Sequence, residues 1–145
     1  MEKPYDYYIC MGWFDEEQEK NYEMITSALK KFDKILFEPR YDAGEMGDGP
    51  LTLERARKIF KADLDGIDKC KALFADISFR DTGGLVEIGY AIAKGIPVIL
   101  FDNSNRPKMN IMLAGSAKNC LRTEQEIYDF LNGEDVFDLG EKEFE

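Results

Sequence analysis

The chain has 145 residues, the size of one ordinary domain, with 44% hydrophobic and 33% charged residues. This composition predicts one compact domain over 1–145 and excludes the bias of disordered chains. The formal net charge of −10 argues against nucleic acid and anionic membrane surfaces as partners, because binding to them depends on Lys and Arg that neutralise phosphates. A small neutral ligand is favoured.

The sequence contains no His and three cysteines, Cys10, Cys70 and Cys120. The cysteines lie far apart without a CxxC pair, so the common zinc sites cannot form and we expect no metal. Any acid-base or nucleophilic chemistry must therefore use carboxylates, Tyr, Lys, Ser or Cys. We find no signal-peptide pattern and no apolar run that could span a bilayer, and we expect a reduced, cytoplasmic setting.

The first third of the chain predicts two strands and one helix. Residues 7–11 form an apolar run that ends at Gly12, and Asp15 provides an N-cap for a helix. An apolar stripe at spacings of three and four follows in this helix, and 34–37 predicts the second strand. Two prolines and three glycines within 38–50 predict a mobile loop that contains neither helix nor strand.

The remaining elements continue the alternation. Thr52 caps a helix to about residue 68, 71–76 and 96–101 predict strands, and 84–94 predicts the crossover helix between them. A weak strand at 119–121 precedes a helix that opens with a capping box, Thr123 with Glu126, and an acidic tail follows at 133–145. This order predicts a doubly wound, flavodoxin-like α/β fold: a five-stranded parallel sheet with helices on both faces. Ligands bind such sheets beyond the carboxyl ends of the strands.

The first strand leads directly into Gly12, Trp13 and Phe14. Glycine permits close approach of backbone and ligand, and a flat nucleobase could stack on the two aromatic rings. Taken alone, the stretch favours a structural role, in which Trp13 and Phe14 staple the first helix onto the sheet.

Two carboxylates have unusual predicted positions. Asp63 lies three residues after Phe60 and four before Ile67, which places it inside an apolar helical stripe, where burial raises a carboxyl pKa. The alternative is a helix that leaves Asp63 in solvent. Glu87 falls in the first turn of the predicted crossover helix, where the helix dipole favours an ionised carboxylate that can act as a nucleophile. The alternative for Glu87 is ordinary capping electrostatics.

Cleavage of an N-glycosidic bond needs two such acids in different protonation states. One carboxylate must be ionised beside the anomeric carbon, and another must hold a proton near the departing base. Glu87 suits the first role, and Asp63 or Asp81 suits the second.

Four stretches together resemble the nucleoside 2-deoxyribosyltransferases: Gly12 to Phe14, Asp63 to Gly66, Asp81 with 87–90 (EIGY), and Asn110 to Met112. The resemblance covers nearly the whole chain. It implies that Glu87 attacks the anomeric carbon of a 2'-deoxynucleoside and that a free nucleobase resolves the deoxyribosyl-enzyme in a ping-pong reaction without an external cofactor. It also implies that Asp63 and Asp81 protonate the departing base and hold the sugar, and that Tyr8 orients the nucleophile.

The resemblance further implies a homo-oligomer, often a hexamer, with shared sites. Gly12, Trp13, Phe14 and Met112 would contact substrate, Asn110 would reach a neighbour's sugar hydroxyl, and the chain-terminal carboxylate, here on Glu145, would lie near a neighbour's base. One departure leaves base preference open, because relatives that accept purines and pyrimidines carry a glutamine in the loop after strand two. Residues 41–49 contain none, and an ionised Glu45 cannot both donate and accept hydrogen bonds.

Three rival functions remain. A 2'-deoxynucleoside 5'-monophosphate N-glycosidase must hold a phosphate, for which only Arg80 and Arg106 lie near the predicted site loops. Plain hydrolysis of deoxynucleosides is the second. The third is a non-catalytic nucleoside-binding or signalling module with the same fold, in which Asp76 would be a phosphoacceptor, although no lysine follows strand four at a suitable place.

Overall fold

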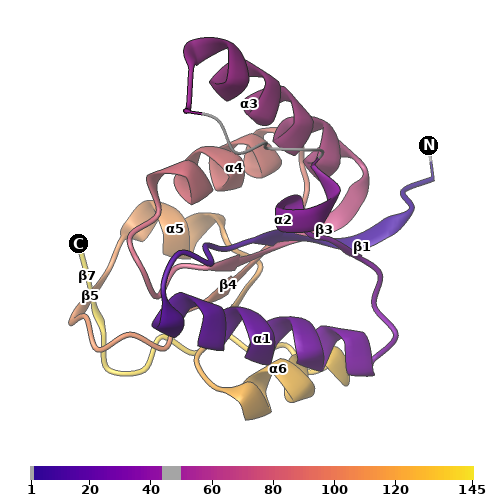
Figure 1. Cartoon of the computed structure of the whole chain (residues 1–145). Coiled ribbons are helices and arrows are strands. Elements are labelled where there is room, and N and C mark those ends of the chain that lie inside the picture. Colours follow the sequence, from indigo (N-terminus) through magenta and orange to yellow (C-terminus); the bar gives the residue numbers. More distant parts are fainter. Residues whose placement is uncertain (1, 44–49) are drawn as a thin grey trace.

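A five-stranded parallel sheet forms the centre of the molecule (Figure 1). The computed structural model describes residues 2–43 and 50–145. The strands run in the order β2-β1-β3-β4-β6, and every neighbouring pair is parallel. Their bounds are β1 Tyr5–Cys10, β2 Leu36–Phe37, β3 Cys70–Asp76, β4 Val98–Phe101 and β6 Asn119–Leu121. The predicted flavodoxin-like α/β fold is therefore confirmed.

Helices cover both faces of this sheet (Figure 1). On one face lie α1 (Glu16–Lys31) and α6 (Glu124–Leu131), and on the other lie α3 (Leu53–Asp68), α4 (Thr82–Ala93) and α5 (Ile111–Ser116). Side chains from α1 and α6 form one hydrophobic cluster with alternate strand residues. The second cluster joins α3, α4 and α5 to the opposite face, as the alternation of side chains along a strand requires.

The predicted caps fix three helix starts. Asp15 accepts a hydrogen bond from the backbone N–H of Gln18, and Thr52 accepts one from that of Arg55. Thr123 accepts from the N–H of Glu126. Each cap satisfies one of the donors that a helix leaves unpaired in its first turn, which is why the predictions for α1, α3 and α6 were confirmed within a residue.

The predicted loop after β2 was wrong in part, because a one-turn helix, α2 (Pro39–Asp42), occupies its first residues. Pro39 stands at the first helical position, where its fixed φ suits a helix and its missing N–H costs nothing. The rest of that predicted loop, 44–49, lies outside the described residues, and so does the predicted substitute Glu45.

The acidic tail contains a strand that the sequence did not predict. Strand β7 (Glu143–Phe144) pairs in parallel with β5 (Lys108–Met109), in register Lys108 with Glu143. Figure 1 shows this pair beside α5, away from the central sheet. Within the described part of the chain, no helix is both long enough and apolar enough to cross a membrane.

Candidate active site

The Glu87 carboxylate is held between two strand side chains. Tyr8 is fully buried, and its hydroxyl donates a short hydrogen bond to Oε2 of Glu87. Cys10 Sγ lies 3.9 Å from Oε1 of the same carboxylate. Tyr8 and Cys10 are two residues apart on β1, so their side chains leave the same face of the sheet, toward α4. Side chains of β1 therefore contact both oxygens of the Glu87 carboxylate.

Glu87 differs from the prediction in its place on the helix and in its charge. Helix α4 begins at Thr82, two residues earlier than predicted, so Glu87 lies in the second turn rather than the first. Burial, with added repulsion from Asp63 and Asp81, raises the pKa of Glu87 to about 7, although the Tyr8 hydroxyl opposes this. The predicted fully ionised Glu87 was therefore wrong, because desolvation outweighs a helix dipole that fades beyond the first turn.

Asp63 comes from the middle of α3 and is half-buried. Burial raises its pKa to about 6, which confirms the direction predicted from the helical stripe. Among the described residues, its carboxylate has no hydrogen-bond or ion-pair partner. Its charge raises the pKa of Tyr8 and of Glu87, so α3 brings this second acid near the Glu87 carboxylate.

Asp81 is the N-cap of α4. Its Oδ1 accepts a hydrogen bond of 3.1 Å from the backbone N–H of Gly84. A side chain on Gly84 would meet the Asp81 carboxylate and the sulfur of Cys10, which explains the glycine here. Asp81 therefore both starts the helix that carries Glu87 and brings a third carboxyl group to this region.

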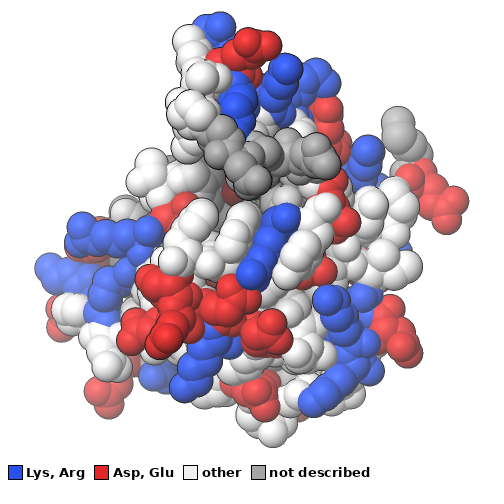
Figure 2. Space-filling view, viewed as in Figure 1, with Lys and Arg blue, Asp and Glu red and all other residues white. Residues whose placement is uncertain are grey.

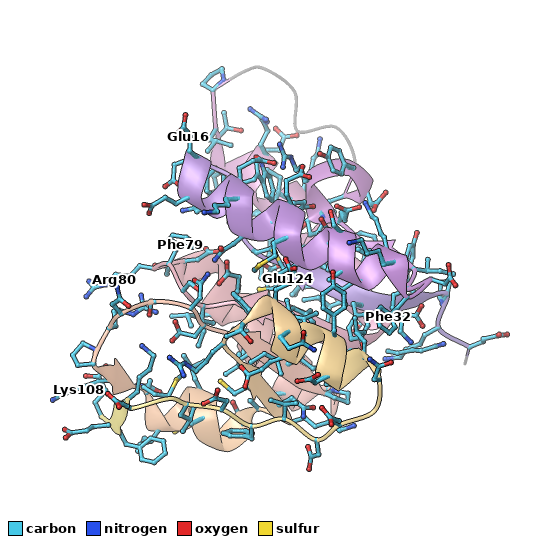
Figure 3. The ribbon with its side chains drawn as sticks, turned by 90° about the horizontal axis from the view of Figure 1, so that it is seen from below. Glu16, Phe32, Phe79, Arg80, Lys108 and Glu124 are labelled. Carbon is cyan, nitrogen blue, oxygen red and sulfur yellow. The ribbon has the colours of Figure 1, made fainter. Side chains whose placement is uncertain are left out.

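A cavity of about 550 Å³ opens beside these residues, beyond the carboxyl ends of β3 and β4. Its lining includes Cys10, Asp81, Asn110 and Glu145. Figure 3 shows Arg80, which follows β3, and Lys108 of β5 at the same end of the molecule, and both line the cavity. Glu87, Tyr8 and Asp63 do not line this cavity themselves. Cys10, which does, lies 3.9 Å from the Glu87 carboxylate.

The remaining predicted site residues do not line this cavity. Trp13 stacks on Phe14 with ring centroids 5.2 Å apart and meets Tyr22 edge-on at 6.4 Å. It also lies beneath the guanidinium of Arg40, at 5.7 Å, so its contacts match the stapling alternative. Phe14 remains 76% exposed.

Gly12 and Met112, which were also predicted to contact substrate, do not line the cavity either. A side chain on Gly12 would collide with the Gln18 amide, so a protein group already approaches this glycine. Met112 of α5 is 76% exposed. Neither residue, in this chain alone, meets the Glu87 carboxylate.

Sequence reasoning missed Cys10. The signal was available, because Cys10 follows Tyr8 by two residues on one strand, and a strand that points Tyr8 at Glu87 also points Cys10 there. Burial and the neighbouring carboxylates raise the pKa of the Cys10 thiol well above its usual value, so it remains a neutral S–H group.

The parallel sheet with helices on both faces, and the three carboxyl groups that α3 and α4 bring together, are typical of an α/β enzyme. The family model for nucleoside 2-deoxyribosyltransferases matches residues 7–121. The chain therefore belongs to the nucleoside 2-deoxyribosyltransferase family, whose members are pentosyltransferases.

Solved structures agree with this assignment. The chain is similar to a 2-deoxyribosyltransferase from the psychrotolerant bacterium Bacillus psychrosaccharolyticus, with 27% identity and a TM-score of 0.78 over 92% of this chain and 99% of that one. It is also similar to a 2-desoxiribosyltransferase from Leishmania mexicana, with 25% identity and a TM-score of 0.55 over 93% and 91%. A curated relative, a 5-hydroxymethyl-dUMP N-hydrolase from Rattus norvegicus, is 25% identical over 119 residues, 81% of this chain and 71% of that protein.

Proposed function

We propose that this protein transfers 2-deoxyribose between nucleobases through a covalent intermediate on Glu87. The observation that carries the proposal is the Glu87 carboxylate fixed by the Tyr8 hydroxyl, with Asp63 and Asp81 near enough to raise its pKa. A carboxylate oriented in this way suits attack on an anomeric carbon.

The reaction has two halves. In the first, a Glu87 oxygen bonds to C1' of the deoxynucleoside, the bond from C1' to the base nitrogen breaks, and the base leaves with a proton from Asp63 or Asp81. In the second, a nitrogen of an incoming base bonds to C1', Glu87 leaves as a carboxylate, and the incoming base returns the proton. No external cofactor enters either half, and water in place of the base gives slow hydrolysis.

Substrate binding must change the protonation of Glu87 and of the second acid. In the free protein burial raises the pKa of both acids, that of Glu87 to about 7 and that of Asp63 to about 6, whereas the first half needs an ionised Glu87 and a protonated second acid. Positive charge that develops on the sugar favours ionised Glu87, and a base stacked over Asp63 excludes water and favours its neutral form. Bound substrate therefore favours the ionised form of Glu87 and the neutral form of Asp63.

The proposal also gives roles to the other site residues that the sequence predicted. Phe14 and Met112, each 76% exposed, contact substrate, whereas Gly12 and Trp13 are already engaged by protein side chains. Asn110 and Glu145 serve a neighbouring subunit's site in a homo-oligomer, a hexamer by family resemblance. Exposed apolar side chains on α4 and α5 support such an assembly: Leu85, Val86, Ile92, Ile111 and Met112. The three free thiols suit the reduced, cytoplasmic setting that we propose.

The decisive experiment is transfer itself. Incubation of the protein with 2'-deoxyinosine and free adenine should yield 2'-deoxyadenosine, and Glu87→Ala should abolish the product while the circular dichroism spectrum stays unchanged. Inosine should react poorly, because an electronegative 2'-hydroxyl destabilises an oxocarbenium-like transition state. Full activity of Glu87→Ala, or equal turnover of inosine, would refute the proposal.

A second candidate is hydrolysis of 2'-deoxynucleoside 5'-monophosphates, which the similarity to the N-hydrolase favours. Arg80, Arg106 and Lys108 line the cavity and could pair with a phosphate. Figure 2 shows the opposite charge over the start of α1, where Glu16, Glu17 and Glu19 gather and would repel one. Release of uracil from dUMP and from 2'-deoxyuridine, without an acceptor base, separates the two: preference for dUMP supports this candidate, and preference for the nucleoside supports transfer.

A further inference from the structure

A buried cation precedes β7 and has no part in the proposed chemistry. The side chain of Lys142 is 7% exposed. Its Nζ donates to the carbonyl oxygen of Ser104 at 3.0 Å and to the Ser104 hydroxyl at 3.3 Å, and also to the carbonyl oxygen of Arg106. An ammonium group is costly to remove from water, and lysine is almost never buried without partners. These contacts are therefore specific.

An equally buried acid faces this lysine. Asp102, at the end of β4, is 3% exposed, and its Oδ2 lies 3.8 Å from Lys142 Nζ. Its other oxygen accepts a hydrogen bond of 2.9 Å from the backbone N–H of Ser104. Lys142 and Asp102 together thus clamp residues 102–106, the connection that leads from β4 into β5.

The clamped segment leads into β5, and Asn110 follows β5 directly. Backbone hydrogen bonds join Glu145 to the two chain neighbours of Asn110. The Glu145 N–H donates to Met109 O at 3.0 Å, and the Ile111 N–H donates to Glu145 O at 3.0 Å. The Asn110 Oδ1 accepts from the N–H groups of Met112 and Leu113 and so caps α5. These bonds use the oxygen of the Asn110 amide and not its Nδ2 donor.

We propose that Lys142 is a positioning residue that holds β7 on β5 and thereby fixes Asn110 and Glu145 at the rim of the cavity. A pair of two-residue strands is too short to be stable alone, so the ladder needs an anchor. The buried ion pair provides it at the base of both strands. This inference rests on the proposed function, because only there does Asn110 contact a sugar hydroxyl.

The first test measures the anchor without activity. The double variant Lys142→Met with Asp102→Asn removes both charges, so neither is left buried and unpaired. Hydrogen exchange in the full-length protein, followed by mass spectrometry, should become at least about tenfold faster in peptides over 107–113 and 141–145, with β1 and α4 unchanged. The matched control is Asp138→Asn, which breaks the exposed pair with Arg122 at 3.6 Å on the same segment and should leave both peptides protected.

The second test asks whether Lys142 acts through Asn110. In the double variant the KM for 2'-deoxyinosine should rise about tenfold with kcat nearly unchanged, as expected for a lost binding contact. Asn110→Asp keeps the capping oxygen and removes the amide donor. Its addition to the double variant should raise KM little further, because residues that act together are not additive.

Unchanged exchange in the two peptides, or fully additive effects on KM, would overturn the role of Lys142. If the unmodified protein gives no transfer product at all, only the proposed function fails. The exchange measurement then still decides the anchor: faster exchange in the double variant supports it, and equal exchange refutes it.

Discussion

At the scale of single residues, the environment of Glu87 determines how activity should depend on pH. The free carboxyl has a pKa of about 7, and only the ionised form can attack. We therefore expect kcat/KM to fall about tenfold for each pH unit well below 7, where Glu87 is protonated, and to fall again at high pH, where the acid that protonates the departing base has lost its proton. A rate profile from pH 5 to 9 with 2'-deoxyinosine and adenine measures this, and a flat profile across that range would contradict it.

Tyr8→Phe should move this profile. The Tyr8 hydroxyl lowers the pKa of Glu87 by donating to it, so its removal should shift the midpoint to higher pH and slow transfer at pH 6 by about tenfold or more. Cys10→Ala should act in the same direction with a smaller effect, because a thiol is a weak donor. Tyr22→Phe is the control, since the Tyr22 hydroxyl bonds to Glu38 instead, and its midpoint should match that of the unmodified protein.

The same raised pKa predicts a cost in stability. A carboxyl group that binds its proton more tightly when folded loses stability as the pH rises from its ordinary value, 4.5, to its folded value, about 7. Glu87→Gln should therefore be more stable than the unmodified protein by roughly 1–3 kcal/mol at pH 8. Below about pH 4.5 the two should be equal. Urea unfolding at pH 4 and pH 8 tests this, and a variant that is less stable at pH 8 would disprove it.

At the scale of elements, the start of α4 combines a structural task with a chemical one. Asp81→Asn keeps an N-cap acceptor for Gly84, so the free energy of unfolding should change by less than about 0.5 kcal/mol. The lost carboxyl group should slow transfer about a hundredfold or more. Thermal unfolding and initial rates separate the two tasks.

A cap remote from the site provides the comparison. Thr123→Ala removes the cap of α6 and should cost about 1 kcal/mol of stability while KM stays unchanged. If Asp81→Asn kept full activity, the carboxyl group of Asp81 would have no chemical role and would serve only as the N-cap of α4.

At the scale of the whole molecule, the exposed apolar side chains of α4 and α5 are the proposed contact between subunits. Val86 is 51% exposed on α4, and Val86→Glu would place a charge within that contact. We expect this variant to sediment as a monomer and to lose transfer activity, since Asn110 and Glu145 would no longer reach a neighbour. Ile35→Glu, at a 56% exposed apolar residue before β2, is the control and should keep the assembly. A monomeric unmodified protein in analytical ultracentrifugation would refute the shared site.

The sequence by itself determined the five strands of the parallel sheet, the helices α1, α3, α4 and α6, and three of the helix caps, but not the short elements α2, β5, α5 and β7. These features depend on local patterns, such as apolar spacing in α1 or Thr123 three residues before Glu126, and local patterns are legible in one chain. It also identified Asp63 as an acid in an apolar stripe. Glu87, Tyr8 and Asp81 were singled out only by their spacing and by resemblance to a family.

Only the tertiary structure decided the electrostatics and the form of the tail. The pKa of Glu87 depends on burial and on residues far away in the chain, Tyr8 and Asp63, which no helical position can reveal. The strand β7 and the anchor at Lys142 follow from contacts with residues about 36 to 38 positions earlier. A two-residue strand has no periodicity to detect, and a buried lysine looks like any other lysine until its partners are placed around it.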